Sequence, residues 1–174
     1  MKKISSFLLI GGGLYLLSRV KQAPLFFYLP RHLEKFRDEI KTAALKYNLD
    51  PLLVAALIHV ESAGDQFATR YEKHLDDSSY GLMQILCSTA EDLLKTDIRD
   101  CSNLFDVSLN IELGSRYLRK QIDRYDGNIR FGIIAYNTGS IRRDPLGQSY
   151  DPNEHFLKVW SFLKLYEQRQ LKEA

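Results

Sequence analysis

The sequence predicts one predominantly helical domain that follows a short hydrophobic N-terminal segment. Apolar residues recur at three- and four-residue spacing over most of the chain, helix start signals precede several of these stretches, and no repeat interrupts them. The chain has 174 residues, of which 45% are hydrophobic and 26% are charged. This composition is that of an ordinary globular protein, and the length suits one sizeable core without a second full domain.

The hydrophobic N-terminal segment comprises residues 1–22. Its apolar stretch has no charge until Arg19 and includes three consecutive glycines at 11–13. Its length falls between a signal-peptide core of roughly 7 to 15 residues and a membrane span of roughly 17 to 25. We expect an uncleaved anchor helix, because Lys21 stands where cleavage after Ala23 would require a small residue. A cleaved signal is the alternative, and an apolar helix packed on the domain is a third, weaker interpretation.

Residues 23–30 connect this segment to the predicted domain at 31–174. They contain an aromatic stretch with a proline near each end, which predicts an extended linker at the membrane interface or against the domain. The helical pattern begins at Arg31. Its apolar face consists of Phe36, Ile40, Ala43, Ala44 and Tyr47.

A second helix is predicted to begin at Asp50 and Pro51, an N-cap residue followed by a proline suited to the first helical turn. Residues 52–60 are apolar on nearly all sides, so we expect this helix to lie in the core. It ends at Glu61, directly before the loop residues 62–64. A carboxyl group at this junction is both partly removed from water and open to a ligand. Removal from water favours the protonated form, which is the form that a general acid needs.

The rest of the domain is predicted from its own start and stop signals. Residues 65–78 are polar and irregular, which predicts a loop of the kind that lines clefts. The later elements are a short helix capped by Ser88 or Thr89 and ending near Leu94, a longer helix capped by Asp106, a turn at 126–128, a helix at 129–137, and a last helix at about 153–168.

Three short motifs follow one another along the chain: Glu61-Ser62, then Ser79-Tyr80-Gly81-Leu82-Met83-Gln84-Ile85, then Ala135-Tyr136-Asn137-Thr138-Gly139. In this order they make the chain resemble the catalytic domain of the soluble lytic transglycosylases and, more distantly, the goose-type lysozymes. The resemblance runs over about residues 36–168. It implies an all-α, lysozyme-like single domain with Glu61 as the catalytic acid.

The resemblance also implies which residues meet the substrate: Ser62, Tyr80, Gly81, Met83, Gln84, Tyr136 and Asn137. Tyr136 resembles a family phenol that helps hold the acid, and Asn137 an amide that binds an acetamido sugar. Gly81 has no Cβ and so lets the backbone approach the sugar. The side chains of Leu82 and Ile85 are expected in the core.

Two enzymatic interpretations differ in the number of carboxyl groups they need. Hydrolysis of a glycosidic bond normally uses two, and the candidates for the second are Asp76 and Asp77, whose positions match the goose-type lysozyme pattern poorly. Lytic transglycosylases, by resemblance, use one glutamate as acid and then as base, and they form a 1,6-anhydro ring on N-acetylmuramic acid without water. We therefore favour the transglycosylase. A non-catalytic wall-binding or assembly protein is a further alternative.

The chain departs from the family pattern late in the domain. Many relatives carry a tyrosine where this chain has Phe156, which follows His155; Tyr150 is a candidate substitute. The histidines have no spacing typical of a metal site, and we expect neither metal nor another cofactor. His59 is expected to be structural because it points to another face of the helix from Glu61. The remaining histidines are His32, His74 and His155.

The charge and the N-terminal segment indicate the partners. A net charge of +2 suits an anionic cell wall and gives no case for nucleic acid. We expect glycan strands of peptidoglycan as the substrate and a membrane as the partner of residues 1–22. The expected location is the cell envelope, with the domain facing the periplasm or the outside or secreted; a virion membrane fits equally.

Two cysteines, Cys87 and Cys101, flank the predicted short helix. Their spacing matches neither a zinc site nor a redox motif. In an oxidising compartment they would form a disulfide beside the cleft; two buried, reduced thiols are the alternative.

Overall fold

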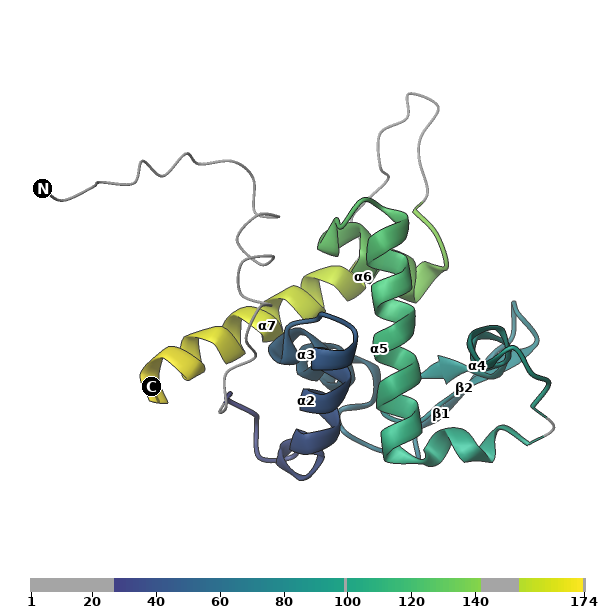
Figure 1. The fold of residues 1–174 in the computed structure, drawn as a ribbon, viewed down its shortest axis with the longest axis horizontal. Helices are drawn as coiled ribbons and strands as arrows, with labels where there is room; N and C mark the ends of the chain where they lie inside the picture. The colour runs from purple at the N-terminus through teal and green to yellow at the C-terminus, as the bar shows by residue number, and fades with distance from the viewer. Residues whose placement is uncertain (1–26, 99, 142–153, 174) are drawn as a thin grey trace, which may run out of the picture.

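The computed structural model describes residues 27–98, 100–141 and 154–173, with a mainly helical fold and one small sheet (Figure 1). The predicted anchor at 1–22, the first residues of the linker, and Tyr150 lie outside the described residues. The helical elements are η1 (Glu34–Phe36), α2 (Arg37–Lys46), α3 (Pro51–Ser62), α4 (Cys87–Leu94), η2 (Cys101–Phe105), α5 (Val107–Arg124), α6 (Ile129–Thr138) and α7 (Glu154–Glu173).

Helix α3 is the centre of the core, as its sequence predicts. The Asp50 side chain accepts a hydrogen bond of 2.8 Å from the backbone N–H of Leu52, and Pro51 occupies the first turn. Every residue from Pro51 to Ile58 is buried. Helices α2 and α7 pack against α3, and α5 packs against α2 and α6 (Figure 1). The catalytic candidate Glu61 therefore stands at the end of the most deeply buried helix among the described residues.

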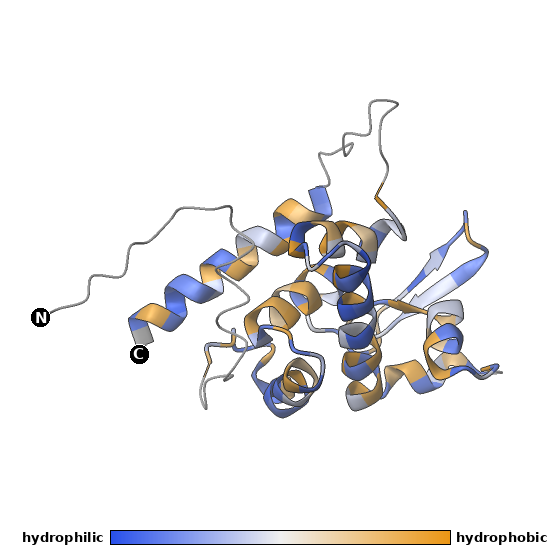
Figure 2. Cartoon of the chain, turned by 45° about the horizontal axis from the view of Figure 1, so that its top comes forward, coloured by the Kyte–Doolittle hydropathy of each residue, from blue (hydrophilic) through white to orange (hydrophobic). Residues whose placement is uncertain are grey.

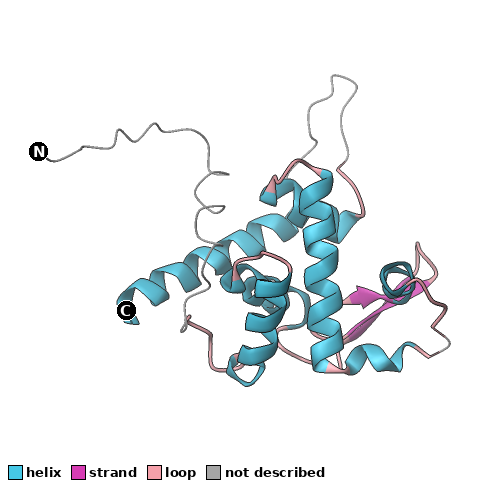
Figure 3. Ribbon diagram, in the orientation of Figure 1, coloured by secondary structure: helices cyan, strands magenta, loops and turns pink. Residues whose placement is uncertain are grey.

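A three-stranded antiparallel sheet replaces the loop that the sequence predicts at 65–78. Its strands are β1 (Thr69–Glu72), β2 (Asp77–Tyr80) and β3 (Ile85–Leu86), in the order β1-β2-β3. Figure 3 shows the sheet beside α4. The first two strands are largely hydrophilic (Figure 2), so they lack the alternation of apolar and polar residues by which a half-buried strand is recognised.

The described part of the linker lies against the domain. Phe27 and Leu29 are buried in the core. The Phe27 carbonyl accepts a hydrogen bond of 2.6 Å from Nη1 of Arg37, and the backbone N–H of Tyr28 donates to the Gln170 side chain. Of the two predicted placements for this aromatic stretch, packing on the domain is the one that residues 27–30 adopt.

Helix α7 continues five residues beyond the predicted end at 168. The contact of Gln170 with the linker accounts for part of this extension, because it adds a partner that the sequence pattern cannot reveal. Among residues 27–98, 100–141 and 154–173, no helix combines the length and hydropathy needed to cross a bilayer.

His59 joins α3 to α7, in agreement with its predicted structural role. Its Nδ1 lies 2.7 Å from the hydroxyl of Tyr166, and its ring stacks on Phe162 at a centroid distance of 3.9 Å. Burial, followed by the charge of His32, lowers the pKa of His59. These contacts favour a neutral imidazole that fixes α7 along α3.

Candidate active site

Glu61 lies in the last turn of α3, where the chain leaves the helix. Ala63 caps the helix in the left-handed conformation with φ +53°, and Gly64 follows with φ +82°. The Glu61 side chain retains only 6% of its exposure. A carboxyl group at the end of a buried helix is held in a fixed position, as general acid–base catalysis requires.

Ser62 connects the end of α3 to the second motif. Its hydroxyl lies within hydrogen-bond distance of the Leu82 carbonyl, at 2.8 Å, and accepts from the backbone N–H of Gly64 at 3.2 Å. The hydroxyl therefore fixes Glu61 relative to the turn that follows β2. Its contact with substrate stays a prediction.

The turn at 81–84 needs a glycine for reasons inside the protein. Gly81 has φ +73°, and a Cβ built there would lie 2.5 Å from Nδ2 of Asn110 and 2.6 Å from the Leu104 carbonyl oxygen. A side chain at this position would therefore be strained and would displace a buried amide. Internal packing is sufficient to explain this glycine, without a sugar against its backbone.

Asn110 organises this turn and was not singled out by the sequence analysis. It is 1% exposed, its Oδ1 accepts from the backbone N–H of Met83, and its Nδ2 donates to the carbonyls of Tyr80 and Leu104, each at 2.8 Å. One side chain thus satisfies three backbone groups, at the end of β2, in the turn that follows it, and in η2. An asparagine within the apolar pattern that follows Asp106 was the signal that could have identified it.

Met83 and Gln84 are held mainly by the protein itself. Met83 is fully buried, and its side chain packs where a Cβ at Gly114 would lie. We therefore expect Met83 to support the cleft from within. The Gln84 amide accepts from Ser79 Oγ at 2.9 Å and donates to the Ala68 carbonyl at 3.0 Å. The amide thereby links the turn after β2 to β2 itself and to the residue that precedes β1.

The third motif lies at the end of α6, and its tyrosine contacts the second motif. The Tyr136 hydroxyl donates a hydrogen bond of 2.7 Å to the Met83 carbonyl. Burial, with the nearby charge of Glu61 as the next contribution, raises the pKa of Tyr136 well above its usual value. The phenol is therefore neutral at any working pH, and it lies near enough to Glu61 to feel its charge. Asn137, the next residue, is exposed.

These motifs border a pocket of about 300 Å³. Gln84, Tyr136 and Asn137 line it, together with His74, Leu75, Ile85, Leu86, Thr89, Tyr117, Thr138 and Gly139. A second pocket of about 570 Å³ shares Thr89, Tyr117 and Gly139 with the first. Because the two pockets share these three residues, they adjoin, and together they are called the groove below. Glu61 does not line either pocket. Tyr136 lines the first one and lies near enough to Glu61 to feel its charge.

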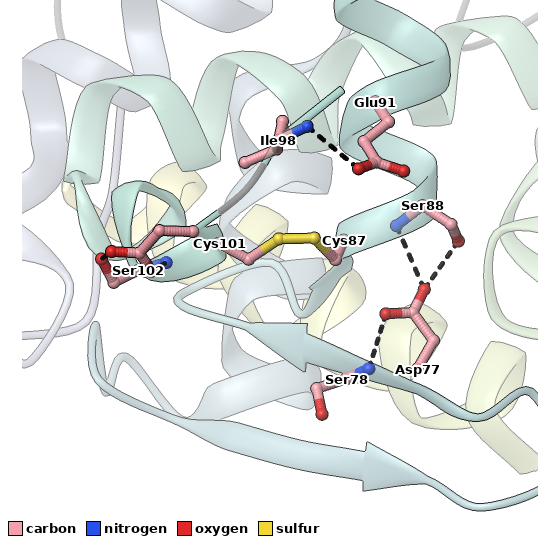
Figure 4. The surroundings of a disulfide bond; sticks show 9 residues. Asp77, Ser78, Cys87, Ser88, Glu91, Ile98, Cys101 and Ser102 are labelled. Carbon is pink, nitrogen blue, oxygen red and sulfur yellow. Dashed lines mark hydrogen bonds between the residues drawn. A yellow bond between two sulfur atoms is a disulfide. The ribbon is translucent and has the colours of Figure 1, made fainter. Parts of the chain in front are cut away.

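The two candidate second carboxylates are occupied elsewhere. Asp77 accepts hydrogen bonds from the backbone N–H and hydroxyl of Ser88, at 3.1 and 2.6 Å, and so caps α4 (Figure 4). This corrects the expectation that Ser88 or Thr89 provides the cap. Asp76 is exposed and accepts from the Tyr71 hydroxyl at 2.5 Å. Neither aspartate lines the described groove.

Replacing Asp77 with asparagine separates its capping contacts from catalysis. We expect Asp77→Asn to lower the free energy of unfolding by about 1 kcal/mol, because a charged cap at the first turn of α4 is lost. The cleavage of peptidoglycan that the sequence predicts should be unchanged. Urea unfolding and a wall-clearing assay measure the two effects, with the exposed Asp76→Asn as the matched control. A severe loss of activity in a folded Asp77 variant would instead identify the second carboxylate of a hydrolase.

His155 is the side chain that meets Glu61, and the sequence analysis did not predict this. Its Nε2 lies 2.8 Å from Oε1 of Glu61. Phe156, where the resemblance leads us to expect a tyrosine, is buried and stacks on Trp160 at a centroid distance of 5.7 Å. The sequence contained a signal, a histidine directly before the apolar face of the last helix. Contact with Glu61 required the packing of α7 against α3.

Cys87 and Cys101 form a disulfide that joins the start of α4 to η2 (Figure 4). Their Cα atoms are 5.9 Å apart, within the range usual for a bridge. Asp77 caps α4 one residue beyond Cys87, so the bridge and the cap hold the same helix end. The described residues contain no cluster of three His, Cys, Asp or Glu side chains able to hold a metal ion.

The bridge should contribute measurably to stability. Its two cysteines are 14 positions apart in the sequence. Closing a loop of this length is expected to stabilise the fold by about 3 kcal/mol, mainly by restricting the unfolded chain. Denaturant unfolding of the double variant Cys87→Ser, Cys101→Ser should show this loss, and reduction of the unchanged protein should reproduce it. Equal stability of the oxidised and reduced proteins would rule the contribution out.

Comparison with known proteins relates this geometry to a family. A transglycosylase of Enterobacteria phage PRD1 is 35% identical over 103 residues, which cover 59% of this chain and 34% of the phage protein. Membrane-bound lytic murein transglycosylase F of Desulfosudis oleivorans is 34% identical over 113 residues, 62% of this chain and 22% of that protein. Membrane-bound lytic murein transglycosylase C of Edwardsiella ictaluri is 31% identical over 128 residues, 64% and 34% respectively. This chain thus matches about a fifth to a third of the length of these relatives.

A solved structure agrees on the fold. An inactive mutant of the lytic transglycosylase Slt from Pseudomonas aeruginosa superposes with a TM-score of 0.59 at 19% identity, over 76% of this chain and 24% of that one. The family model of the transglycosylase SLT domain matches residues 38–155. That range contains all three motifs and the contact between Glu61 and His155. The predicted resemblance is confirmed, and the chain belongs to the transglycosylase SLT domain family.

Proposed function

We propose that this protein is a peptidoglycan lytic transglycosylase. It cleaves the β-1,4 bond between N-acetylmuramic acid and N-acetylglucosamine and leaves a 1,6-anhydro ring on the muramic acid. Glu61 acts as general acid and then as general base. The names of the relatives, which are transglycosylases of a phage and of bacterial membranes, support this class of reaction.

In the first step, protonated Glu61 gives its proton to the glycosidic oxygen, which leaves as the 4-hydroxyl of N-acetylglucosamine. The bond from that oxygen to C1 of the muramic acid breaks, and C1 acquires oxocarbenium character. The Glu61 carboxylate then takes the proton from the 6-hydroxyl of the same sugar, and O6 bonds to C1. Glu61 regains its proton, and no water is consumed.

The surroundings of the three candidate catalytic carboxyl groups are the observation that carries this proposal. Glu61 is nearly buried at the end of α3, with its carboxyl near the phenol of Tyr136. Asp77 caps α4, and Asp76 is exposed and paired with Tyr71. This arrangement favours a reaction that needs one carboxyl group over hydrolysis, which normally needs two.

The groove supplies the parts that a glycan strand needs. Asn137 is exposed at its wall, where its amide can bind an acetamido group, and Gln84 lies on the sheet side. Tyr80 does not line either pocket, and its ring packs edge-on against Phe105. Ser62, Gly81 and Met83 act one layer below, since their described contacts keep the turn and Glu61 in place. Tyr136 connects the two layers through the Met83 carbonyl.

The proposed substrate determines where the domain must act. Peptidoglycan lies outside the cytoplasmic membrane, so the domain acts in the cell envelope, and residues 1–22 anchor it there. The disulfide between Cys87 and Cys101 suits such an oxidising compartment.

Mass spectrometry of the products tests the proposed reaction. The protein is incubated with purified peptidoglycan, and the released muropeptides are compared with those from a known lysozyme. Products lighter by one water than the hydrolytic ones are expected. Full-mass products would make the protein a lysozyme. Folded protein that binds the wall and releases nothing would make it a binding or assembly protein.

A further inference from the structure

The contact between Glu61 and His155 is nearly sealed from water. The two side chains retain 6% and 13% of their exposure, and Nε2 lies 2.8 Å from Oε1. Glu61 comes from the last turn of α3 and His155 from the first turn of α7, two helices that pack along each other (Figure 1). The geometry is thus fixed by the core and not by a surface loop.

The other ring nitrogen identifies the form of the imidazole. Nδ1 of His155 is buried and has no hydrogen-bond partner within residues 27–98, 100–141 and 154–173. In a charged imidazolium both nitrogens carry a proton, and a buried N–H without an acceptor is unfavourable. The arrangement therefore favours a neutral ring with a bare Nδ1 and an Nε2–H that donates to Glu61 Oε1.

We propose that His155 is a positioning residue that holds Oε1 of Glu61 and leaves Oε2 as the oxygen through which the catalytic proton enters and leaves. This inference rests on the proposed function of Glu61. In the acid form, Oε2 carries the proton and Oε1 accepts from Nε2–H. After transfer, the same hydrogen bond stabilises the carboxylate while Oε2 takes the next proton. His155 keeps its own proton throughout, so the balance of the reaction is unchanged.

Two substitutions at position 155 test the proposal. His155→Gln places an amide N–H near the position of Nε2 but cannot take up a proton, whereas His155→Ala removes the donor. The exposed His32→Gln is the matched control. Each variant is first checked for folding by circular dichroism. The turnover number and KM are then measured on soluble glycan strands.

We expect His155→Ala to lower turnover by about tenfold to a hundredfold, as loss of an orienting partner does elsewhere, with KM unchanged. His155→Gln should keep most of the turnover, because its amide N–H can still donate to Oε1. His32→Gln should match the unchanged protein. If the alanine variant does not fold, the folded glutamine variant alone decides, because loss of its turnover would show that a donated hydrogen bond is not what Oε1 needs.

Some outcomes overturn the proposal. Unchanged turnover in His155→Ala would show that Oε1 needs no donor, and turnover as low in folded His155→Gln as in His155→Ala would show that donation to Oε1 is not what His155 supplies. Either result leaves the proposed function intact, provided that the unchanged protein releases anhydro products. If the unchanged protein releases no such products, the proposed function itself fails, and the two failures are thereby distinguished.

Discussion

Glu61→Gln is expected to reduce the release of muropeptides by about a thousandfold or more, because it removes both the acid and the base of the reaction. The amide keeps the shape of the side chain, and its oxygen can still accept a hydrogen bond from His155. The fold should therefore persist, with a melting temperature close to that of the unchanged protein. Chromatography of the soluble products measures the loss, and calorimetry checks the fold.

Glu112→Gln is the matched control for this experiment. Glu112 lies on the surface of α5, where its Oε1 pairs with Nζ of Lys46. An exposed pair of this kind contributes little to stability, so Glu112→Gln should keep full activity. Substantial activity in a folded Glu61→Gln protein would be incompatible with a single-carboxylate mechanism.

Asn110→Ala is expected to lower the free energy of unfolding by about 3 to 5 kcal/mol, because it leaves three buried backbone groups without partners. Those groups are the N–H of Met83 and the carbonyls of Tyr80 and Leu104. Urea unfolding measures the loss. Asn103→Ala, at an exposed position in η2, is the control and should change stability by less than about 0.5 kcal/mol.

Asn110→Ala should also lower activity under conditions in which the variant is folded. Asn110 accepts a hydrogen bond from the backbone N–H of Met83. The carbonyl of the same Met83 accepts a hydrogen bond from the Tyr136 hydroxyl. Loosening the turn therefore loosens the phenol next to Glu61. A folded Asn110→Ala protein with full activity and unchanged stability would refute the assigned role of this amide.

Helices were predictable where the local signals agreed. Asp50 and Pro51 stand directly before an unbroken apolar run, so the start, the burial and the end of α3 all follow from adjacent residues. Asp106 likewise caps α5 by accepting from the N–H of Leu109 at 2.8 Å. These contacts lie within one helical turn, which is the range that a sequence pattern can report.

The sheet, and the residues that hold the site from behind, were not predictable in the same way. Strand β1 is mostly exposed and is paired through its backbone, so its side chains carry no periodic signal. Asn110 and His155 act on partners 27 and 94 positions away, Met83 and Glu61. Their roles depend on how helices pack, and neither helix pattern alone indicates the partner. The family resemblance identified Glu61 but pointed to Phe156 for the role of its neighbour.

Cleavage in water enriched in oxygen-18 tests the central claim most directly, because only hydrolysis adds an oxygen atom from water to the muramic acid. Products are reduced with borohydride at once to prevent exchange at the sugar end. A transglycosylase in which Glu61 serves as acid and base should release muropeptides that carry no label and resist reduction. Reducible products with one labelled oxygen at the muramic acid end would contradict it and establish hydrolysis.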